Sequence, residues 1–389
     1  MHVLEIETFG RGGLIHYCYN LSSALAERGH QVTLLTTAAY ELDERDLPAN
    51  LSLVKAIARS THRARDSLSG RTLGLARKIE AVVDAITVAN ISRRLRPDVI
   101  HFHSTNTSAL PYLALLRLLR VPVAATAHVV TPHERIRFQD TIYRRIHGLS
   151  DLVIAHSDVD RVRLLREFAV DPDRVVVIPH GEYRFFDRGG EVLDRQAARS
   201  GLGLSPQDEV ALFFGYIREY KGLDVLLEAW PAVVEARPAA RLVVAGDPGR
   251  LAPDRRDQLE TRANSLGVLH RFEYIPFSDV ARYFGAADVL AMPYRHVSQS
   301  GVLYLALSLG VPVIATKVGA LPEVLRDGVN ALLVPPESPT ALATALIRAL
   351  GDPGLRGRLA QGGTLVAQQH SWPSIAERTE RAFARLTGK

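Results

Sequence analysis

A chain of 389 residues is long enough for roughly two or three domains with their own cores, and 47% hydrophobic with 23% charged residues is the composition of a globular protein. The single cysteine excludes a disulfide framework and a thiol metal cluster, and it suits a reducing cytosol. A formal net charge of +5 is basic, but the sequence lacks the pattern of a nucleic-acid-binding module. We expect no leader peptide after Met1, and no apolar run approaches the ~20 residues of a spanning helix.

The chain opens with a strand–helix–strand pattern around a glycine-rich turn. A strand is expected over 3–7 and a helix over 14–27, with Cys18 on the apolar face of that helix as a packing residue. Gly12 and Gly13 lie in the turn, where backbone can approach a ligand closely. Their spacing is not that of the dinucleotide fingerprint, so a tight turn without a ligand is the alternative.

Polar residues follow a later strand, expected over 97–103. His101 and His103 lie on one face of it because side chains alternate, but two histidines without a third ligand are weak evidence for a metal. Ser104 and Asn106 come next in a polar loop. With His103 they are predicted to bind an acceptor hydroxyl.

His128 ends the next expected strand, 121–127, at the edge where such sheets bind ligands. The prediction is therefore a functional histidine, with a structural role as the alternative. Further strands are expected over 152–155 and 175–178, and the polar, basic run 59–71 reads as a mobile loop.

The second half repeats the strand–helix pattern, with strands expected over 210–214, 241–245 and 287–293. After the first of them, Arg218 and Lys221 lie three positions apart at a helix start. Both cations can therefore face one anion. Two solvated basic side chains are the alternative.

A loop rich in Ser and Gly precedes another helix, expected over 302–309. It consists of Ser298, Gln299, Ser300 and Gly301. Unpaired N–H groups and the positive end of the helix dipole suit an anion such as a diphosphate. An ordinary N-cap is the alternative.

Together these segments resemble the family 4 retaining glycosyltransferases over nearly the full length. The motifs that carry the likeness are Pro179-His180-Gly181, Gly215 with Arg218 and Lys221-Gly222, Gly246-Asp247, and Ala306, Gly310, Pro312-Val313, Ala315-Thr316, Gly319 and Pro322-Glu323. The family has the GT-B fold, so the resemblance implies an α/β chain of two Rossmann-like doubly wound domains facing across a cleft. The domains are expected over 1–182, joined by a C-terminal helix over 371–389, and over 207–370, with a linker over 183–206.

The resemblance also implies roles for individual residues. Arg218 and Lys221 would hold the donor diphosphate as it departs and His128 would lie close to the transferred sugar, which makes these three the expected catalytic residues. The donor would also contact Gly12, Gly13, Tyr274, Ile275, Ser298, Gln299, Ser300 and Gly301. Neither a metal nor a cofactor is expected, and the co-substrate would be a nucleotide-diphosphate sugar, with UDP or GDP as the nucleotide.

The chain departs from the family pattern at its acidic residues. Aligned on Ala306 and Gly310, Val297 and Leu305 stand where the family has a Glu-x7-Glu pair that contacts the donor. Val129 replaces an Asp that is common after the histidine. The roles of those acids are not carried over.

The leading function is transfer of a sugar to an acceptor hydroxyl with retention of anomeric configuration, in polysaccharide or glycoconjugate biosynthesis. The alternatives are a catalytically degenerate sugar-nucleotide-binding partner protein and a nucleotide-sugar epimerase of the GT-B fold. The acceptor could be a saccharide, a lipid-linked saccharide or a small metabolite, and no nucleic acid is expected. A cytoplasmic location is expected, with peripheral contact to the inner membrane face through the basic residues of the first half, Arg59, Arg63, Arg65, Arg71, Arg135, Arg137, Arg144 and Arg145.

Overall fold

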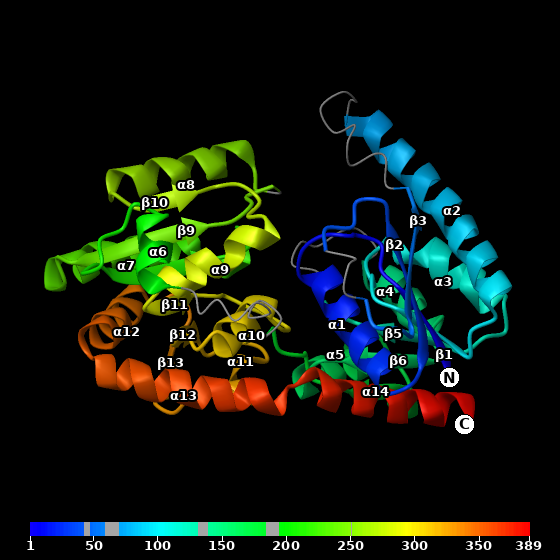
Figure 1. Cartoon of the computed structure of the whole chain (residues 1–389). Helices are drawn as coiled ribbons and strands as arrows, with labels where there is room; N and C mark the ends of the chain where they lie inside the picture. The colour runs from blue at the N-terminus through cyan, green and yellow to red at the C-terminus, as the bar shows by residue number, and fades with distance from the viewer. Residues whose placement is uncertain (43–46, 59–69, 131–138, 184–193, 250) are drawn as a thin grey trace. The chain divides into compact units, whose positions relative to one another are not determined.

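The computed structural model describes residues 1–42, 47–58, 70–130, 139–183, 194–249 and 251–389. They form two compact units, Met1–Gly181 with Ser371–Lys389, and Glu182–His370 (Figure 1). Each unit contains one parallel sheet between layers of helices, as the resemblance implied. The segment expected as a loop over 59–71 lies largely outside the described residues, as do Arg135 and Arg137.

Seven parallel strands form the sheet of the first unit in the order β3-β2-β1-β4-β5-β6-β7. The strands are β1 His2–Ile6, β2 Gln31–Thr37, β3 Leu51–Ile57, β4 Val99–Phe102, β5 Val123–Thr126, β6 Leu152–Ala155 and β7 Val175–Val177. Every residue of β4, β5 and β6 is buried, because helices cover both faces of the sheet. The strand order reverses between β1 and β4, so the loops after these two strands diverge.

Helices of the first unit pack on opposite faces of this sheet. They are α1 Gly13–Glu27, α2 Gly70–Leu95, α3 Ala109–Arg117, α4 Gln139–Gly148, α5 Asp158–Glu167 and α14 Trp372–Thr387. Helices α1 and α14 share a core with Val3, whereas α2 and α3 share another with Leu4. Adjacent residues of β1 thus enter different cores, as strand alternation requires. Cys18 is buried in the first core, which confirms its predicted packing role.

Six parallel strands form the sheet of the second unit in the order β10-β9-β8-β11-β12-β13. The strands are β8 Glu209–Phe214, β9 Ala240–Ala245, β10 Leu269–Arg271, β11 Val289–Met292, β12 Val313–Thr316 and β13 Ala331–Val334. The order reverses between β8 and β11, which pair directly through Val289 and Ala211. This sheet therefore has its own reversal point, at the carboxyl ends of β8 and β11.

The helices of the second unit are α6 Arg195–Ser200, α7 Leu223–Ala236, α8 Pro253–Ser265, α9 Phe277–Ala286, α10 Gly301–Ser308, α11 Leu321–Val324, α12 Pro339–Gly351 and α13 Pro353–Gln369. Helix α6 lies within the stretch 183–206 that we expected to be a linker, and it packs on α9. Its Arg199 is buried and pairs with Asp288 at 2.7 Å. The charge of Arg199 is thus neutralised inside the unit by a residue distant in sequence.

Candidate functional site

The predicted donor-binding residues meet where the second sheet reverses. Gly215 directly follows β8, and the loop before α10 follows β11. A Cβ on Gly215 would lie 3.0 Å from Cγ2 of Val302 and 3.1 Å from Nζ of Lys221. The loop after β8, the buried lysine and the start of α10 therefore converge at the point where open parallel sheets bind ligands.

Gly222 holds this arrangement together through a backbone conformation that favours glycine. Its φ is +67°, in the left-handed region, and a Cβ there would overlap the carbonyl oxygen of Pro293. Pro293 directly follows β11, so the end of the lysine turn packs against the neighbouring loop. This close approach fixes the position of Lys221.

Lys221 is a buried ammonium group without an acidic partner among the described residues. Its side chain is 6% exposed, and Nζ lies 5.4 Å from the centroid of the Tyr294 ring. Burial, followed by the charge of Arg218, lowers its pKa from 10.5 to about 7. A buried cation that lacks a counter-charge is costly, so an anion at this point would stabilise it.

Arg218 is the N-cap of the short turn Glu219–Lys221, and it is near enough for its charge to lower the pKa of Lys221. Nη1 of Arg218 donates to the carbonyl oxygen of Ile217 at 2.9 Å, and its guanidinium lies 5.2 Å from the centroid of the Tyr216 ring. These contacts orient the guanidinium at the end of β8. One diphosphate could contact both groups.

The loop 298–301 supplies polar groups at the start of α10. Ser300 is the N-cap, and its hydroxyl accepts the N–H of Leu303 at 3.4 Å. Ser298 is also buried, and Gly301 packs against the Tyr183 hydroxyl. Oε1 of Gln299 is buried and makes no hydrogen bond to any described residue. A ligand hydroxyl would satisfy this acceptor.

The positions of the family's glutamates belong to the hydrophobic core. Val297 and Leu305 are 3% and 6% exposed, and the carbonyl oxygen of Val297 accepts the N–H of Ala320 at 3.3 Å. Apolar side chains packed in the core therefore occupy the two positions where the family has glutamates. Tyr274 and Ile275 follow β10 at the same sheet edge, with Ile275 buried and Tyr274 half-buried.

In the first unit, carboxylates hold the glycine turn. Glu7 accepts the N–H of Gly10 at 2.7 Å, and Glu41 accepts the N–H of Gly12 at 2.5 Å. Gly12 is the N-cap of α1, which begins at Gly13. The amide that we predicted to face a donor phosphate is therefore occupied by Glu41, and a phosphate would have to displace that carboxylate.

Four consecutive strands of the first sheet are followed by histidines: His103 after β4, His128 after β5, His156 after β6 and His180 after β7. Their ring centroids lie 5.6, 4.7, 5.3 and 5.0 Å, in that order, from that of Tyr17. His128 is half-buried and the other three are buried. The predicted histidine is thus the most exposed member of a cluster at the carboxyl edge.

Both ring nitrogens of His128 are engaged by its neighbours. Nε2 lies 3.4 Å from Nδ1 of His103, and Nδ1 lies 3.1 Å from Nε2 of His156. Burial, and then the nearby histidines, place the pKa of His128 well below 6.5. The ring is therefore a neutral group held between two others.

The predicted acceptor-binding residues are used mainly inside the protein. His103 is 1% exposed, and Oγ of Ser104 accepts the N–H of Thr8 at 3.2 Å. Asn106 is half-buried, and its Oδ1 accepts the N–H of Ser108 at 2.9 Å. Ser108 is the N-cap residue of α3. Asn106 is the member of the predicted set that retains exposed surface.

Sequence reasoning missed Glu5, His156 and His180. Glu5 is completely buried in β1, where its Oε2 contacts Nε2 of His103 and lies 2.9 Å from Nδ1 of His101. The available signal was a histidine at the end of four successive apolar strands. Only the sheet order shows that these strands are neighbours.

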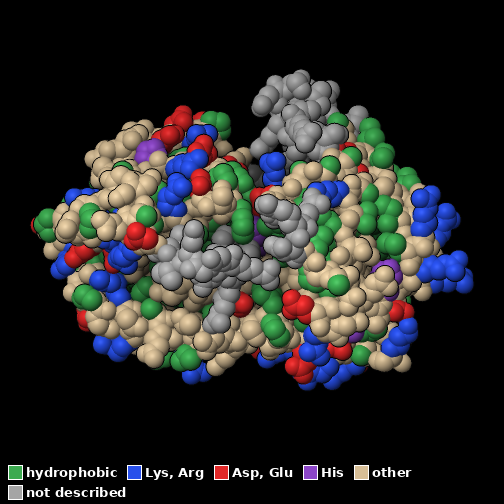
Figure 2. Space-filling view, in the orientation of Figure 1, with side chains coloured by type: hydrophobic (Ala, Val, Ile, Leu, Met, Phe, Trp, Pro, Cys, Tyr) green, Lys and Arg blue, Asp and Glu red, His purple; other side chains and the backbone are tan. Residues whose placement is uncertain are grey.

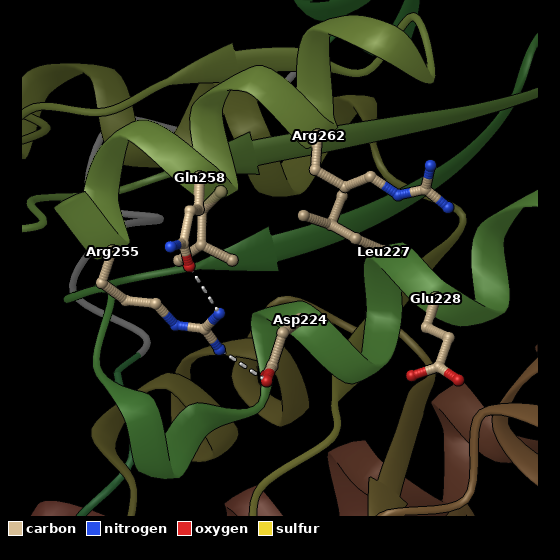
Figure 3. A pocket seen from close by; sticks show the side chains of 7 residues that line it. Asp224, Leu227, Glu228, Arg255, Gln258 and Arg262 are labelled. Carbon is tan, nitrogen blue, oxygen red and sulfur yellow. Dashed lines mark hydrogen bonds and ion pairs between the residues drawn. The ribbon is translucent and has the colours of Figure 1, made fainter.

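A surface hollow lies between α7 and α8, and none of the predicted site residues lines it (Figure 3). It is lined by Asp224, Leu227, Glu228, Arg255, Gln258, Leu259 and Arg262. Arg255 pairs with Asp224 at 2.8 Å and contacts Gln258 at 3.4 Å. Arg255 and Asp224 thus neutralise each other, whereas Lys221 has no acidic partner among the described residues.

The two units have the fold of the GT-B glycosyltransferases. The structure of Anabaena HepE in complex with UDP and glucose gives a TM-score of 0.77 at 18% identity, with 99% of each chain covered. Sucrose-phosphate synthase from Thermosynechococcus elongatus gives a TM-score of 0.76 at 21% identity, with 100% of this chain and 99% of that chain covered. These likenesses confirm the predicted fold class.

Sequence comparisons identify the family. Residues 11–181 match the family model described as Glycosyltransferase Family 4, and residues 208–352 match that of Glycosyl transferases group 1. The D-inositol 3-phosphate glycosyltransferase of Actinosynnema mirum is 30% identical, over 99% of this chain and 95% of its own length. The D-inositol 3-phosphate glycosyltransferase of Streptomyces bingchenggensis is also 30% identical, over 96% of this chain and 84% of its own length. The chain belongs to glycosyltransferase family 4.

Proposed function

We propose that this glycosyltransferase moves a sugar from a nucleotide-diphosphate donor to an acceptor hydroxyl with retention of anomeric configuration. The observation that carries the proposal is the buried ammonium of Lys221, which lacks an acidic partner among the described residues and lies close to Arg218. A diphosphate supplies the missing counter-charge. As the sugar–phosphate bond breaks, both cations would stabilise the charge that develops on the departing diphosphate.

Neutral groups of the site suit the sugar part of the donor. Oε1 of Gln299, which makes no hydrogen bond to any described residue, would accept a sugar hydroxyl. The contact of His128 with the transferred sugar is proposed from the family resemblance alone. Two fixed cations can do the work of a metal ion, so we propose catalysis without metal or cofactor. Glycosyl transfer that persists after extensive treatment with a chelator would support catalysis without metal. Loss of activity on chelation, with recovery when Mg²⁺ is added, would contradict it.

UDP-sugars are the first donors to test, because solved structures of HepE contain UDP, UDP with glucose, and UDP-glucose. GDP-, ADP- and dTDP-sugars complete the panel. D-inositol 3-phosphate is the first acceptor, since two curated relatives are named for glycosyl transfer involving it. Lipid-linked and soluble saccharides follow. Donor binding without turnover across these acceptors would favour the degenerate binding protein, and conversion of the donor sugar without an acceptor would favour the epimerase.

The cation pair is tested by substitution. Arg218→Ala and Lys221→Ala should each remove about 2–4 kcal/mol of transition-state stabilisation, measured as a fall in kcat/KM. Each variant lacks a group that is proposed to contact the leaving diphosphate. Arg348→Ala is the matched control: Arg348 is exposed in the last turn of α12, at the opposite edge of the sheet. Turnover near the wild-type value in both test variants would refute the proposed site.

Peripheral membrane contact is a second part of the proposal. Helix α2 exposes Ile79, Val82, Val83 and Ile86, with exposed fractions of 57, 47, 55 and 49%, at a spacing that places them on one face. None of the described helices is long and apolar enough to cross a membrane. Lys and Arg side chains occur in several separate groups on the face shown in Figure 2.

We expect Val83→Asp to reduce co-sedimentation with phosphatidylserine vesicles, because it places a charge on the apolar face of α2. Leu365→Asp is the control, since Leu365 is 55% exposed in the second unit. Equal vesicle binding by both variants would contradict membrane contact through α2.

A further inference from the structure

A continuous chain of ring and carboxylate contacts crosses the first unit from β1 to β7. Glu5 contacts Nε2 of His103, whose Nδ1 lies 3.4 Å from Nε2 of His128. Nδ1 of His128 lies 3.1 Å from Nε2 of His156, whose Nδ1 lies 2.9 Å from the carbonyl oxygen of Ile178. Four contacts therefore link three imidazoles between two oxygen acceptors.

Both ends of the chain accept hydrogen bonds and cannot donate them. The end at Ile178 is a carbonyl oxygen. At the other end, burial alone would raise the pKa of Glu5, but electrostatic attraction to the ring N–H groups of His101 and His103 and hydrogen bonds from them lower it to about 2. Glu5 is thus a carboxylate at neutral pH. Each end therefore requires an N–H from the imidazole beside it.

These ends determine the tautomers of the rings. His103 must carry its proton on Nε2, toward Glu5, and His156 must carry its proton on Nδ1, toward Ile178. Nε2 of His156 is then an acceptor, so His128 must carry its proton on Nδ1. Burial is the largest cause of the lowered pKa of all three rings, which favours neutral imidazoles.

Three neutral rings hold three protons, but the chain has four contacts. The contact left without a proton is the one between Nδ1 of His103 and Nε2 of His128. At 3.4 Å it is also longer than the two other contacts that His128 and His156 make, at 3.1 and 2.9 Å. Two bare lone pairs face each other there, and this repulsion agrees with the greater distance.

We infer that Glu5 and His156 are positioning residues for His128: from the two ends of the chain they fix its Nδ1–H tautomer and keep Nε2 free of a proton. His128 then presents an unprotonated Nε2, a hydrogen-bond acceptor that a substrate hydroxyl can use by replacing the contact with His103. The inference deepens the proposed function, and it depends on that proposal for the position of His128 beside the sugar. A proton taken up between His103 and His128 would close the gap and remove that acceptor.

A metal ion among Glu5, His101 and His103 fits the geometry less well than this proton arrangement. The three offer one carboxylate and two ring nitrogens, a set that could bind a metal. Two nitrogen or oxygen ligands of one tetrahedral Zn²⁺ lie about 3.3 Å apart, given metal–ligand distances near 2.0 Å. Oε2 of Glu5 lies only 2.9 Å from Nδ1 of His101 and closer still to His103. These are hydrogen-bond distances.

Other titratable groups also surround the chain. They are Tyr17 and Cys18 of α1, Glu7 beyond the end of β1, His101 of β4, and His180 after β7. Burial, and then the charges of Glu7 and Glu5, place the pKa of the Cys18 thiol well above 9, so it stays protonated. The tautomers are therefore set chiefly by the two ends of the chain.

The tautomers can be read directly by long-range ¹H–¹⁵N correlation spectra of the full-length chain with ¹⁵N-labelled histidine at pH 7.5, without substrate. We expect His103 to be protonated on Nε2 alone and His128 on Nδ1 alone. The reverse tautomer of His128, an imidazolium at either ring, or a stoichiometric metal measured in the same sample would overturn the inference. Because no substrate is used, this result stands or falls separately from the proposed function.

Glu5→Gln gives a second, sharper test. The new amide can donate to Nε2 of His103, which moves that ring's proton to Nδ1 and closes the gap to His128 with a neutral hydrogen bond. We expect the His103 tautomer to switch and kcat/KM to fall about tenfold. Glu7→Gln, a buried carboxylate in the turn after β1, should leave the His103 tautomer unchanged. An unchanged tautomer in Glu5→Gln would mean that the new amide presents its oxygen to His103 as the carboxylate does, so the wild-type spectrum then decides alone, as it does if that variant does not fold.

Discussion

Donor affinity should depend on pH in a direction that Lys221 determines. Burial and the charge of Arg218 lower the pKa of Lys221 from 10.5 to about 7, so the empty site is mostly charged at pH 6 and mostly neutral at pH 8. A nucleotide-sugar diphosphate binds the charged form and raises that pKa, because it supplies the counter-charge. Affinity should therefore weaken as pH rises through 7.

The size of the effect follows from the protonated fraction. With a pKa of about 7, that fraction falls from roughly nine-tenths at pH 6 to roughly one-tenth at pH 8, so Kd should rise about tenfold, or about 1.4 kcal/mol. Calorimetry with UDP-glucose, or with the donor that the panel identifies, measures this, since a sugar diphosphate does not itself titrate in the range. Lys221→Met should bind weakly with a flat profile. A wild-type Kd that is constant or falls from pH 6 to 8 would refute this role for Lys221.

Further predictions concern stability, measured as chemical unfolding. Gly222→Ala should lower the free energy of unfolding by about 2 kcal/mol, because φ is +67° and the new Cβ would overlap the carbonyl oxygen of Pro293. Gly357→Ala is the matched control: it lies in α13 with no heavy atom within 4 Å of a new Cβ, and it should add up to about 1 kcal/mol. Asp288→Asn should cost about 3 kcal/mol, since it leaves the buried Arg199 without the charge it pairs with at 2.7 Å. Unchanged stability in Gly222→Ala or Asp288→Asn would show that the turn or the α6 contact is not rigid.

Local sequence patterns predicted the parts of this molecule that depend on neighbouring residues. The apolar run 152–155 is β6, because a parallel strand covered on both faces needs a continuous apolar sequence. Arg218 and Lys221 are three positions apart, so one turn brings them together. The family motifs predicted the overall fold with its two sheets.

The histidine chain could not be predicted in the same way. His128 and His156 come from different strands, and only the order β4-β5-β6-β7 makes them neighbours. Alternation placed His101 and His103 on one face but did not reveal Glu5 opposite them. The pairing of Arg199 could not be predicted for a similar reason, since its partner Asp288 lies far along the chain.

The central claim is retaining transfer from a nucleotide sugar held by the cation pair. Its most direct test is ¹H NMR of the complete reaction with an α-linked donor and the acceptor that the panel identifies. We predict an α-glycoside formed in equal amount to the released nucleoside diphosphate, and loss of both products in Arg218→Ala. A β-glycoside, or full product formation by that variant, would contradict the account.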